Sequence, residues 1–378
     1  MGNWRWWQLL GWVGLGMLAS LGGVWSDPLA AQGYAPPFLL SLRQQPTDFS
    51  QYSLGSPFQT QRVVIPPQFD KARGFSEGLA AVNIDGQWGF INRVGDRVIP
   101  ATYDFVLDFS QGKAAVRRGD LWGYINPQGQ EVIPLRYQQA GRFSEGLAAI
   151  RINNRAGYIN LQGQMVIAPR FGVAQEFSQG LGLVRIKRKW GYVDKTGLLA
   201  IQPQFDGGSG FSEGLAVIHQ NGKSGYINRG GEVVIPAIYD EALSFTEGLG
   251  LVKIGQKWGF VDPTGQLAIQ PQFDTAFRFS EGLASVEMAG KSFYIDPQGE
   301  VVLKSPLDLG FGVALNFSEN WGAIGIGDKW GYIDKLGNLV IPPQFDRVSF
   351  FSEGMAAVNI NNKWGYVSKR RFIPEFDR

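Results

Sequence analysis

Basic side chains recur at one position of an internal repeat, and they are the residues best placed to bind a ligand. Five successive copies carry Arg117, Arg151, Arg185, His219 and Lys253 directly after an apolar Val or Ile. Because alternate residues of a strand share a face, we expect these side chains to lie on a polar face. In a regular stack of repeats they would form a basic row suited to an extended anionic partner. Alternatively, Lys and Arg simply keep an exposed strand soluble.

Carboxylates recur in two further columns, but neither column predicts catalysis. Glu77 of a Phe-Ser-Glu-Gly motif is replaced by Gln111 in the next copy, and Asn126 of an Asx column is matched by Asp194. Acid and amide side chains both accept hydrogen bonds, whereas only the acid transfers protons, so these positions need an acceptor. His219 is the only histidine, and there is no cysteine. We therefore expect no catalytic residues, no metal site and no cofactor, and predict that the protein is not an enzyme.

The composition is that of a folded protein without a strong electrostatic preference. The chain has 378 residues, 44% hydrophobic and 18% charged, with a formal net charge of +2. So small a net charge gives no general attraction to nucleic acid or to membrane surfaces, and nucleic acid is not an expected partner.

Three sequence markers repeat in register over residues 61–378 and define about nine units. The glycine of a Trp-Gly pair recurs every 34 residues from Gly89 to Gly259, and Gly331 and Gly365 resume the period after an insertion of four residues. The Phe-Ser-Glu-Gly motif and a Val-Ile-Pro-Pro-Gln-Phe-Asp motif keep the same spacing. Such periodicity is the signature of a repeat array, which grows by adding units to one continuous core.

Each unit is predicted to contain three short strands and no helix. Alternating apolar residues at 146–152, a Trp-Gly-Tyr-Ile-Asn segment at 122–126 and a Val-Val-Ile-Pro segment exemplify them. An Asx-x-x-Gly turn joins the second and third strands, and proline ends the third because it cannot donate to a ladder. The large aromatic residues are expected to form the core. Their Trp column is assigned a structural role at Trp88, Trp122, Trp190, Trp258, Trp330 and Trp364.

Two departures from the repeat predict backbone geometry. Asn320 replaces the last glycine of the Phe-Ser-Glu-Gly motif, and Asn is the residue after Gly that best tolerates a positive φ, so a left-handed backbone is expected there. Phe293 replaces a Trp-Gly glycine. A left-handed conformation would resist Phe, so close packing is the expected reason for glycine in the other copies.

The segments Lys189–Asp194 and Lys329–Asp334, both Lys-Trp-Gly-Tyr-Val/Ile-Asp, resemble the WG-repeat (KWG-repeat) family of bacterial proteins. The resemblance covers roughly residues 61–378. Ala156, Ser224 and the Ser292-Phe293 pair depart from it. It implies a β-repeat array without established enzymatic activity, and it supplies no functional residues.

An open superhelical solenoid of three-stranded β-meanders is the architecture that we predict, with a closed propeller-like ring as the alternative. A unit of 34 residues is short for a four-stranded propeller blade, and nine units exceed the usual blade number. The last unit also contains its own Arg371–Asp377 segment of the third-strand type, so an extra strand at Arg62–Asp70 has no blade left to complete.

Residues 1–31 are predicted to be a signal peptide, with Arg5 before an apolar run at Leu9–Val24 and cleavage after Ala31. Residues 32–60 are a Pro/Gln/Ser-rich linker. The predicted function is an exported (periplasmic, envelope or extracellular) non-catalytic protein that binds a protein or an anionic polysaccharide. The alternative is a structural envelope scaffold without a dedicated ligand, attached to the membrane only through an uncleaved N-terminal segment.

Overall fold

A computed structural model describes residues 62–304 and 312–369. The predicted signal peptide and linker lie outside the described residues, as does the Arg371–Asp377 segment. The described residues form strands and turns without a helix. No helix in this part of the chain is long and apolar enough to cross a membrane.

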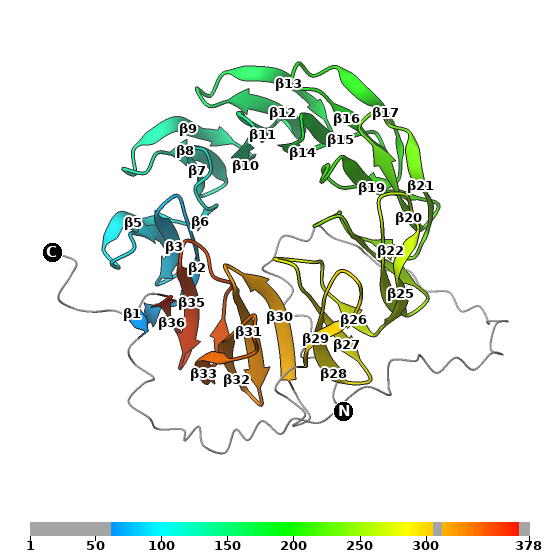
Figure 1. The fold of residues 1–378 in the computed structure, drawn as a ribbon. Helices are drawn as coiled ribbons and strands as arrows, with labels where there is room; N and C mark the ends of the chain where they lie inside the picture. The colour runs from blue at the N-terminus through cyan, green and yellow to red at the C-terminus, as the bar shows by residue number, and fades with distance from the viewer. Residues whose placement is uncertain (1–61, 305–311, 370–378) are drawn as a thin grey trace, which may run out of the picture. The chain divides into compact units, whose positions relative to one another are not determined.

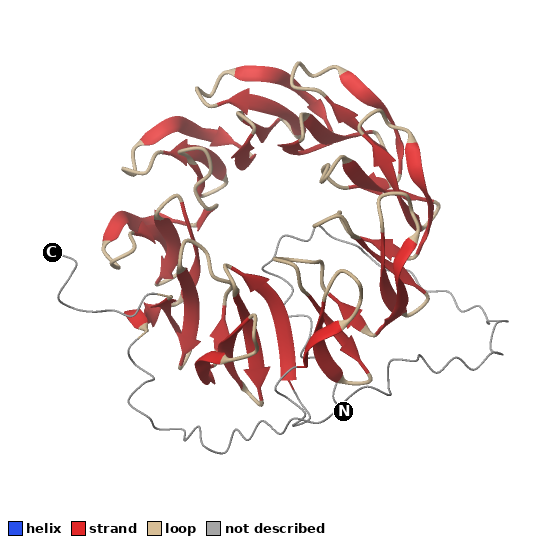
Figure 2. Cartoon of the chain, viewed as in Figure 1, coloured by secondary structure: helices blue, strands red, loops and turns tan. Residues whose placement is uncertain are grey.

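The strands form nine antiparallel four-stranded sheets, arranged as the blades of a closed ring (Figures 1 and 2). In blades 1 to 8 the four strands pair in the order in which they occur along the chain, and blade 9 takes its fourth strand from the N-terminus. Figure 1 shows first strands such as β10 (Gln139–Ser144) and β14 (Val173–Ser178) nearest the centre of the ring, and fourth strands such as β13 (Met165–Phe171) and β17 (Leu199–Phe205) at its rim. The protein is therefore a nine-bladed β-propeller.

The first strands of blades 1 to 9 are β2 (Lys71–Ser76), β6 (Phe105–Val106), β10 (Gln139–Ser144), β14 (Val173–Ser178), β18 (Gly207–Gly208), β22 (Glu241–Ala242), β26 (Thr275–Ala276), β30 (Gly312–Ser318) and β34 (Arg347–Val348). The second strands are β3 (Leu79–Ile84), β7 (Ala114–Arg118), β11 (Leu147–Ile152), β15 (Leu181–Ile186), β19 (Leu215–Gln220), β23 (Gly250–Ile254), β27 (Ala284–Met288), β31 (Trp321–Ile326) and β35 (Met355–Ile360).

The third strands are β4 (Gln87–Ile91), β8 (Leu121–Ile125), β12 (Arg155–Asn160), β16 (Lys189–Val193), β20 (Lys223–Asn228), β24 (Lys257–Val261), β28 (Lys291–Ile295), β32 (Lys329–Asp334) and β36 (Lys363–Ser368). The fourth strands are β5 (Arg97–Tyr103), β9 (Glu131–Tyr137), β13 (Met165–Phe171), β17 (Leu199–Phe205), β21 (Val233–Tyr239), β25 (Leu267–Phe273), β29 (Val301–Lys304), β33 (Leu339–Phe345) and, in blade 9, the N-terminal strand β1 (Val63–Phe69).

The prediction of an open solenoid is wrong, because β1 pairs with β36 and closes the ring. Val63 lies opposite Val367, and Phe69 lies opposite Trp364. The C-terminal copy of the fourth-strand motif is too closely spaced for this register. Eight residues separate Gly365 from Ile373 (373 − 365), whereas ten separate Gly123 from Ile133 (133 − 123). The Asx and Gly residues that turn the chain in the other blades are also missing from 368–370.

The prediction of three strands per unit is also wrong, because each blade has a fourth strand nearest the ring centre. This strand follows the Phe-Asp end of the preceding blade, and in blades 2, 5, 6, 7 and 9 it is only two residues long. Its side chains vary too much between copies to show an alternating pattern. Short turns let a unit of 34 residues hold four strands.

Neighbouring blades share their hydrophobic cores, as the repeat-array interpretation requires. Each buried cluster draws on two adjacent blades, and the cluster around Ile65, Phe75 and Tyr366 joins blade 9 to blade 1. At every junction an aromatic ring of a third strand contacts a phenylalanine of the next blade, as in the pair Tyr192–Phe211 with ring centroids 4.9 Å apart. Burial of whole aromatic side chains at all nine junctions stabilises the closed ring.

The Trp-Gly glycine is required by close packing, as its replacement pattern predicted. A Cβ at Gly191 would lie 2.5 Å from the Ile201 carbonyl oxygen of the fourth strand, although this glycine does not have a positive φ. In blade 7, Phe293 instead lies directly opposite Lys304 without the local bulge found in other blades. The predicted left-handed backbone at Asn320 is confirmed, with φ of 65°.

Candidate functional site

The two ends of each blade lie on opposite faces of the ring, and the two faces carry different side chains. The turns between first and second strands, which carry the Phe-Ser-Glu-Gly motif, lie on one face, here called the Glu face. The turns between second and third strands and the connections between blades lie on the other, here called the Asp face. This division follows from the antiparallel strand order of every blade.

On the Glu face, the Glu/Gln column makes a closed ring of hydrogen bonds between blades. Each side chain accepts the backbone N–H of the corresponding turn in the next blade: Glu77 from Gly112, Gln111 from Gly146, and, across the closure, Glu353 from Gly78. The Asx column accepts backbone N–H groups within its own turn, by amide at Asn92 and by carboxylate at Asp194. Both columns therefore act as acceptors, which confirms the interpretation drawn from their acid–amide exchange.

On the Asp face, an aspartate between consecutive blades joins them in a similar way. Asp206 follows β17 and accepts a hydrogen bond from Lys189 of its own blade and another from the backbone N–H of Asn221 in the next. The hydrogen bond from Lys189 has the largest effect in lowering the pKa of this carboxyl, and the backbone hydrogen bond has the next largest. Asp70 makes the equivalent bonds across the ring closure, to Lys363 and to Asp85 N. The sequence analysis missed this role, although the recurrent Phe-Asp and Lys-Trp pairs were its visible signal.

The Asp face has a basic sector over blades 2 to 4. The connecting aspartate is replaced by Gln138 between blades 2 and 3 and by Gly172 between blades 3 and 4. The basic sector is defined here as Arg117, Arg118, Arg151, Arg155, Arg185, Lys187 and Arg188. Arg117 and Arg118 lie near the connecting Asp104, whereas Arg151 bonds to Gly172 O at one of the two connections without aspartate. Among the residues that the structure describes, none of these seven forms an ion pair.

Arg117, Arg151 and Arg185 hold equivalent places on the second strands of these blades. Arg117 lies opposite Trp122 and Arg185 opposite Trp190, with each guanidinium carbon within 6 Å of its indole ring (5.9 and 5.7 Å). Ala156 replaces Trp beside Arg151, which donates to the backbone oxygens of Gly172 and Asn154 instead. In all three the Nε atom is buried without a partner in the described part of the chain. The guanidinium groups are thus fixed in position by packing.

The other two members of the predicted basic row differ in charge or pairing. Burial lowers the pKa of His219, whose Nδ1 lies 2.9 Å from the Ser224 hydroxyl, so the ring is neutral at pH 7. Lys253 forms an ion pair of 2.9 Å with Glu241. Since the blades close into a ring, the five positions also follow an arc and not a straight row. The cation cluster also contains Arg118 and Arg155, at strand ends, and Lys187 and Arg188, in a turn. The basic residues within 185–189 were its sequence signal.

The hydroxyl group beside His219 is not accessible to a substrate. Ser224, the hydrogen-bond partner of His219, is 2% exposed. Among residues 62–304 and 312–369, no group of three or more His, Cys, Asp or Glu side chains could hold a metal ion. The guanidinium groups of the Asp face are of the kind that donates paired hydrogen bonds to carboxylate or phosphate oxygens.

The tryptophans of the Trp-Gly column support the blade junctions. Trp88 is buried, and Trp122, Trp190, Trp258, Trp330 and Trp364 are half-buried against the hydrophobic clusters. In four of them a cationic side chain also lies over the indole ring; the Lys253 ammonium, for example, lies 5.3 Å from the ring centroid of Trp258.

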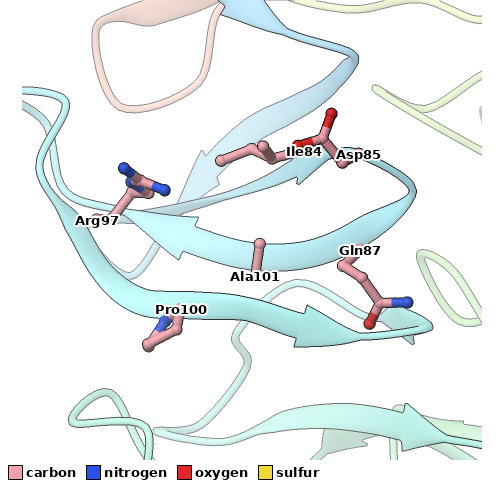
Figure 3. Close-up of a pocket in the computed structure, with 6 residues that line it drawn as sticks. All are labelled: Ile84, Asp85, Gln87, Arg97, Pro100 and Ala101. Atoms are coloured by element: carbon pink, nitrogen blue, oxygen red, sulfur yellow. The ribbon is translucent and has the colours of Figure 1, made fainter.

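A shallow hollow on blade 1 lies outside the basic sector. It has a volume of about 460 Å³ and is lined by Ile84, Asp85, Gln87, Arg97, Pro100 and Ala101 (Figure 3). Figure 3 shows these side chains spread along one blade, with Arg97 far from the Asp85 turn. They do not converge on a common point, so the hollow has no defined binding geometry.

Comparison with known protein families identifies the repeat. The model of the WG-containing repeat matches eight times, at residues 59–88, 88–122, 122–155, 157–190, 190–223, 225–258, 258–291 and 330–364. The chain belongs to the WG-repeat family. The gap in the matches to this WG-repeat protein, residues 292–329, begins where Ser292 and Phe293 replace Trp and Gly in blade 7 and extends over the insertion into the first two strands of blade 8. A search of curated proteins gave no match.

Several solved structures are similar to this WG-repeat protein at low sequence identity. A eukaryotic initiation factor superposes with a TM-score of 0.52 at 11% identity, over 75% of this chain and 89% of that one. The dihydro-heme d1 dehydrogenase NirN gives 0.45 at 10% identity, over 75% and 76%. AztD from Citrobacter koseri gives 0.37 at 16% identity, over 81% and 98%. The likeness to the initiation factor shows the fold alone.

Proposed function

We propose that this WG-repeat propeller is a non-catalytic binding protein whose basic sector holds an anionic partner, either an acidic protein segment or an anionic polysaccharide. The observation that carries the proposal is a set of seven cations on blades 2 to 4 that form no ion pair within the described part of the chain. Five of them belong to the blades beside the two connections that lack the usual aspartate, and Arg117 and Arg118 lie near Asp104. Elsewhere on this face Lys189, Lys223, Lys257, Lys329 and Lys363 are each paired with a connecting aspartate.

The geometry of the three central arginines supports recognition of an anion. Packing against tryptophan or binding to backbone oxygens fixes each guanidinium, so little side-chain entropy is lost when a ligand binds. Guanidinium groups also match the paired oxygens of carboxylate and sulfate groups. Because the partner's charge and not a pocket would supply the attraction, binding should weaken as salt screens the interaction.

The test replaces exposed turn cations, which leaves the packed arginines in place. In a triple variant Arg118→Glu, Arg155→Glu and Arg188→Glu, we expect retention on immobilised polyglutamate or alginate at low salt to fall by at least about tenfold, since attraction becomes repulsion. The matched control is Arg97→Glu, Arg229→Glu and Arg278→Glu, exposed arginines outside the basic sector that give the same change in net charge.

Equal loss of retention in both triple variants would show a nonspecific charge effect and overturn the proposed site. Absence of salt-sensitive retention by the unmodified protein on both polymers would overturn anionic binding itself. That second result would leave the structural scaffold as the remaining function.

The proposal includes export of the protein, supported by the charged residue Arg5 and the apolar run Leu9–Val24. Expression of the full chain in a bacterium followed by fractionation should place the propeller outside the cytoplasm. N-terminal sequencing should then start near Gln32. Recovery of the uncleaved chain in the cytoplasm would contradict this part of the proposal.

A further inference from the structure

The two connections without an aspartate differ in what replaces its carboxylate. Between blades 2 and 3, the Gln138 side chain takes over the role of acceptor and binds the backbone N–H of Asn154. Between blades 3 and 4, Gly172 has no side chain and offers no acceptor at this position. The second connection therefore lacks a group that Asp or Gln supplies at the other connections within the described residues.

The donors that bind the carboxylate elsewhere are kept around this glycine. At the next connection, Asp206 binds a lysine 17 residues before it, Lys189, and a backbone N–H 15 residues after it, at Asn221. The residues at the same two offsets from position 172 are Arg155 and Lys187. Lys187 has a φ of 55°, close to the 52° of Asn221, so the two turns present their N–H groups in the same way. Neither the Arg155 guanidinium nor the Lys187 N–H has an acceptor among the described residues.

A third donor, Arg185, lies beside the same position. A Cβ added at Gly172 would lie 3.6 Å from its Nε atom and 3.9 Å from its Nη2 atom. That Nε is buried without a partner in the part of the chain that the structure describes, and the guanidinium lies against the Trp190 ring. A carboxylate at the place of the missing aspartate would therefore lie among two guanidinium groups and a backbone N–H, which donate charge-assisted hydrogen bonds.

We propose that the Gly172 position is a binding site for one carboxylate of an acidic polypeptide, whose aspartate or glutamate side chain takes the place of the missing connecting aspartate. The proposal rests on the proposed anion-binding function and assigns its central contact. The depth of the site favours a polypeptide, because the equivalent Asp206 side chain is only 45% exposed between its two blades. A carboxylate on the flexible stem of Asp or Glu can reach such a position, whereas the carboxylate of a uronic acid is attached directly to a bulky sugar ring.

Gly172→Asp tests the site by filling it from within the chain. Its φ is not positive and its Cβ would meet nothing closer than the Arg185 backbone oxygen at 3.4 Å, so aspartate fits without strain. We expect the Tm to rise, because the variant gains the hydrogen bonds of the other connections. Retention on immobilised polyglutamate at low salt should fall at least about fivefold, because the donors are no longer free to bind the ligand.

Gln138→Asp is the matched control, since it gives the same change in net charge on the same face without filling the Gly172 position. It should lower retention on polyglutamate by less than about twofold, as expected for one surface charge. Equal losses in the two variants, or a lower Tm in Gly172→Asp, would overturn the proposal. A selective effect of Gly172→Asp on alginate and not on polyglutamate would overturn the assignment to a polypeptide and assign the site to a uronic acid.

Sodium acetate provides a test that is independent of any polymer. Compared with sodium chloride at the same ionic strength, acetate should raise the Tm of the natural protein by about 2 °C more than that of Gly172→Asp, because only the natural protein has the open site. The comparison between the two proteins removes the general effect of the salt on stability. The absence of this difference, together with equal losses of polyglutamate retention in Gly172→Asp and Gln138→Asp, would overturn the carboxylate site and leave the proposed anion-binding function standing.

Discussion

At the scale of single residues, several recurrent side chains form their hydrogen bonds with the next blade and not with their own. The serine of the Phe-Ser-Glu-Gly motif donates its hydroxyl to a phenylalanine backbone oxygen of the next blade, as Ser212 does to Phe245. Tyrosines of the third strands do the same, as with Tyr192 and Ser209 O, and burial raises the pKa of these phenols. A substitution at such a position therefore weakens a junction between blades.

Thr246→Ser should stabilise the protein by about 1 kcal/mol. Thr246 holds the serine position in blade 6, and its buried Oγ1 has no partner in the described structure, unlike Ser212 in the same place in blade 5. A serine hydroxyl would reach Phe279 O and complete the series. Denaturant unfolding measures the change, and Ser212→Thr should produce a loss of similar size. Neutral results for both substitutions would contradict the role of this bond.

Gly191→Ala should destabilise the protein by about 3 kcal/mol, the upper part of the range for overpacking. The new Cβ would lie 2.5 Å from Ile201 O and 2.7 Å from Pro203 N, and both are backbone atoms that cannot move aside independently. Gly141→Ala is the control, because its Cβ would meet nothing closer than 3.5 Å. Thermal unfolding of the two variants compares them. Similar Tm losses would show that chain flexibility, not close approach, explains the effect.

At the scale of strands, the third and fourth strands of a blade vary together. Where the third strand has glycine, the fourth strand bulges over it, as β17 does over Gly191. Where blade 7 has Phe293, the fourth strand β29 runs without that bulge and lacks the Ile-Pro pair. The family pattern at one strand therefore depends on the sequence of the strand beside it.

Phe293→Gly restores the family pattern in blade 7, yet it should destabilise the protein by about 2 kcal/mol. The substitution removes a half-buried aromatic side chain that packs against the blade 6–7 cluster, and β29 has no bulge to occupy the space. Urea unfolding gives the free-energy change. Replacing residues 301–304 together with Phe293 by the corresponding residues of blade 6 should recover part of the loss. An increase in stability from Phe293→Gly alone would contradict the coupling of the two strands.

At the scale of the whole molecule, the connecting aspartates make the ring sensitive to acid. Hydrogen bonds from lysine and backbone N–H groups lower the pKa values of Asp70, Asp206, Asp240, Asp274 and Asp346 in the folded protein. A carboxyl whose pKa is lower in the folded than in the unfolded protein stabilises the fold at pH values above its unfolded pKa, near 3.8. This stabilisation is lost as the pH falls through the lower pKa of the folded protein.

We expect the Tm to fall as the pH is lowered below about 4, because several junctions lose their ion pairs over the same range. A triple variant with Asp206→Asn, Asp240→Asn and Asp274→Asn should have a lower Tm at pH 7 and a flatter decline in acid. Gln138 shows that an amide can occupy this position, since it accepts the Asn154 N–H. Parallel Tm–pH curves for the variant and the natural protein would contradict this assignment.

The sequence alone determined the features that depend on local geometry. The period of the markers, the left-handed backbone at Asn320, the close approach at the Trp-Gly glycine and the acceptor role of the Glu/Gln and Asx columns could all be read from substitutions between copies. The basic row could be placed on a polar strand position. Each is a property of one turn or one strand, and nine copies gave repeated examples of it.

Tertiary structure decided the number of strands per blade, the closure of the ring and the shape of the candidate site. The first strands have no side-chain pattern and exist because they pair with second strands at the centre of the ring. Closure joins Val63 to Val367, and whether two ends meet depends on the rotation accumulated over all the blades, which no single repeat specifies. Closure also turned the predicted straight row into an arc, and the replacements Gln138 and Gly172 left two connections beside blade 3 without the usual aspartate.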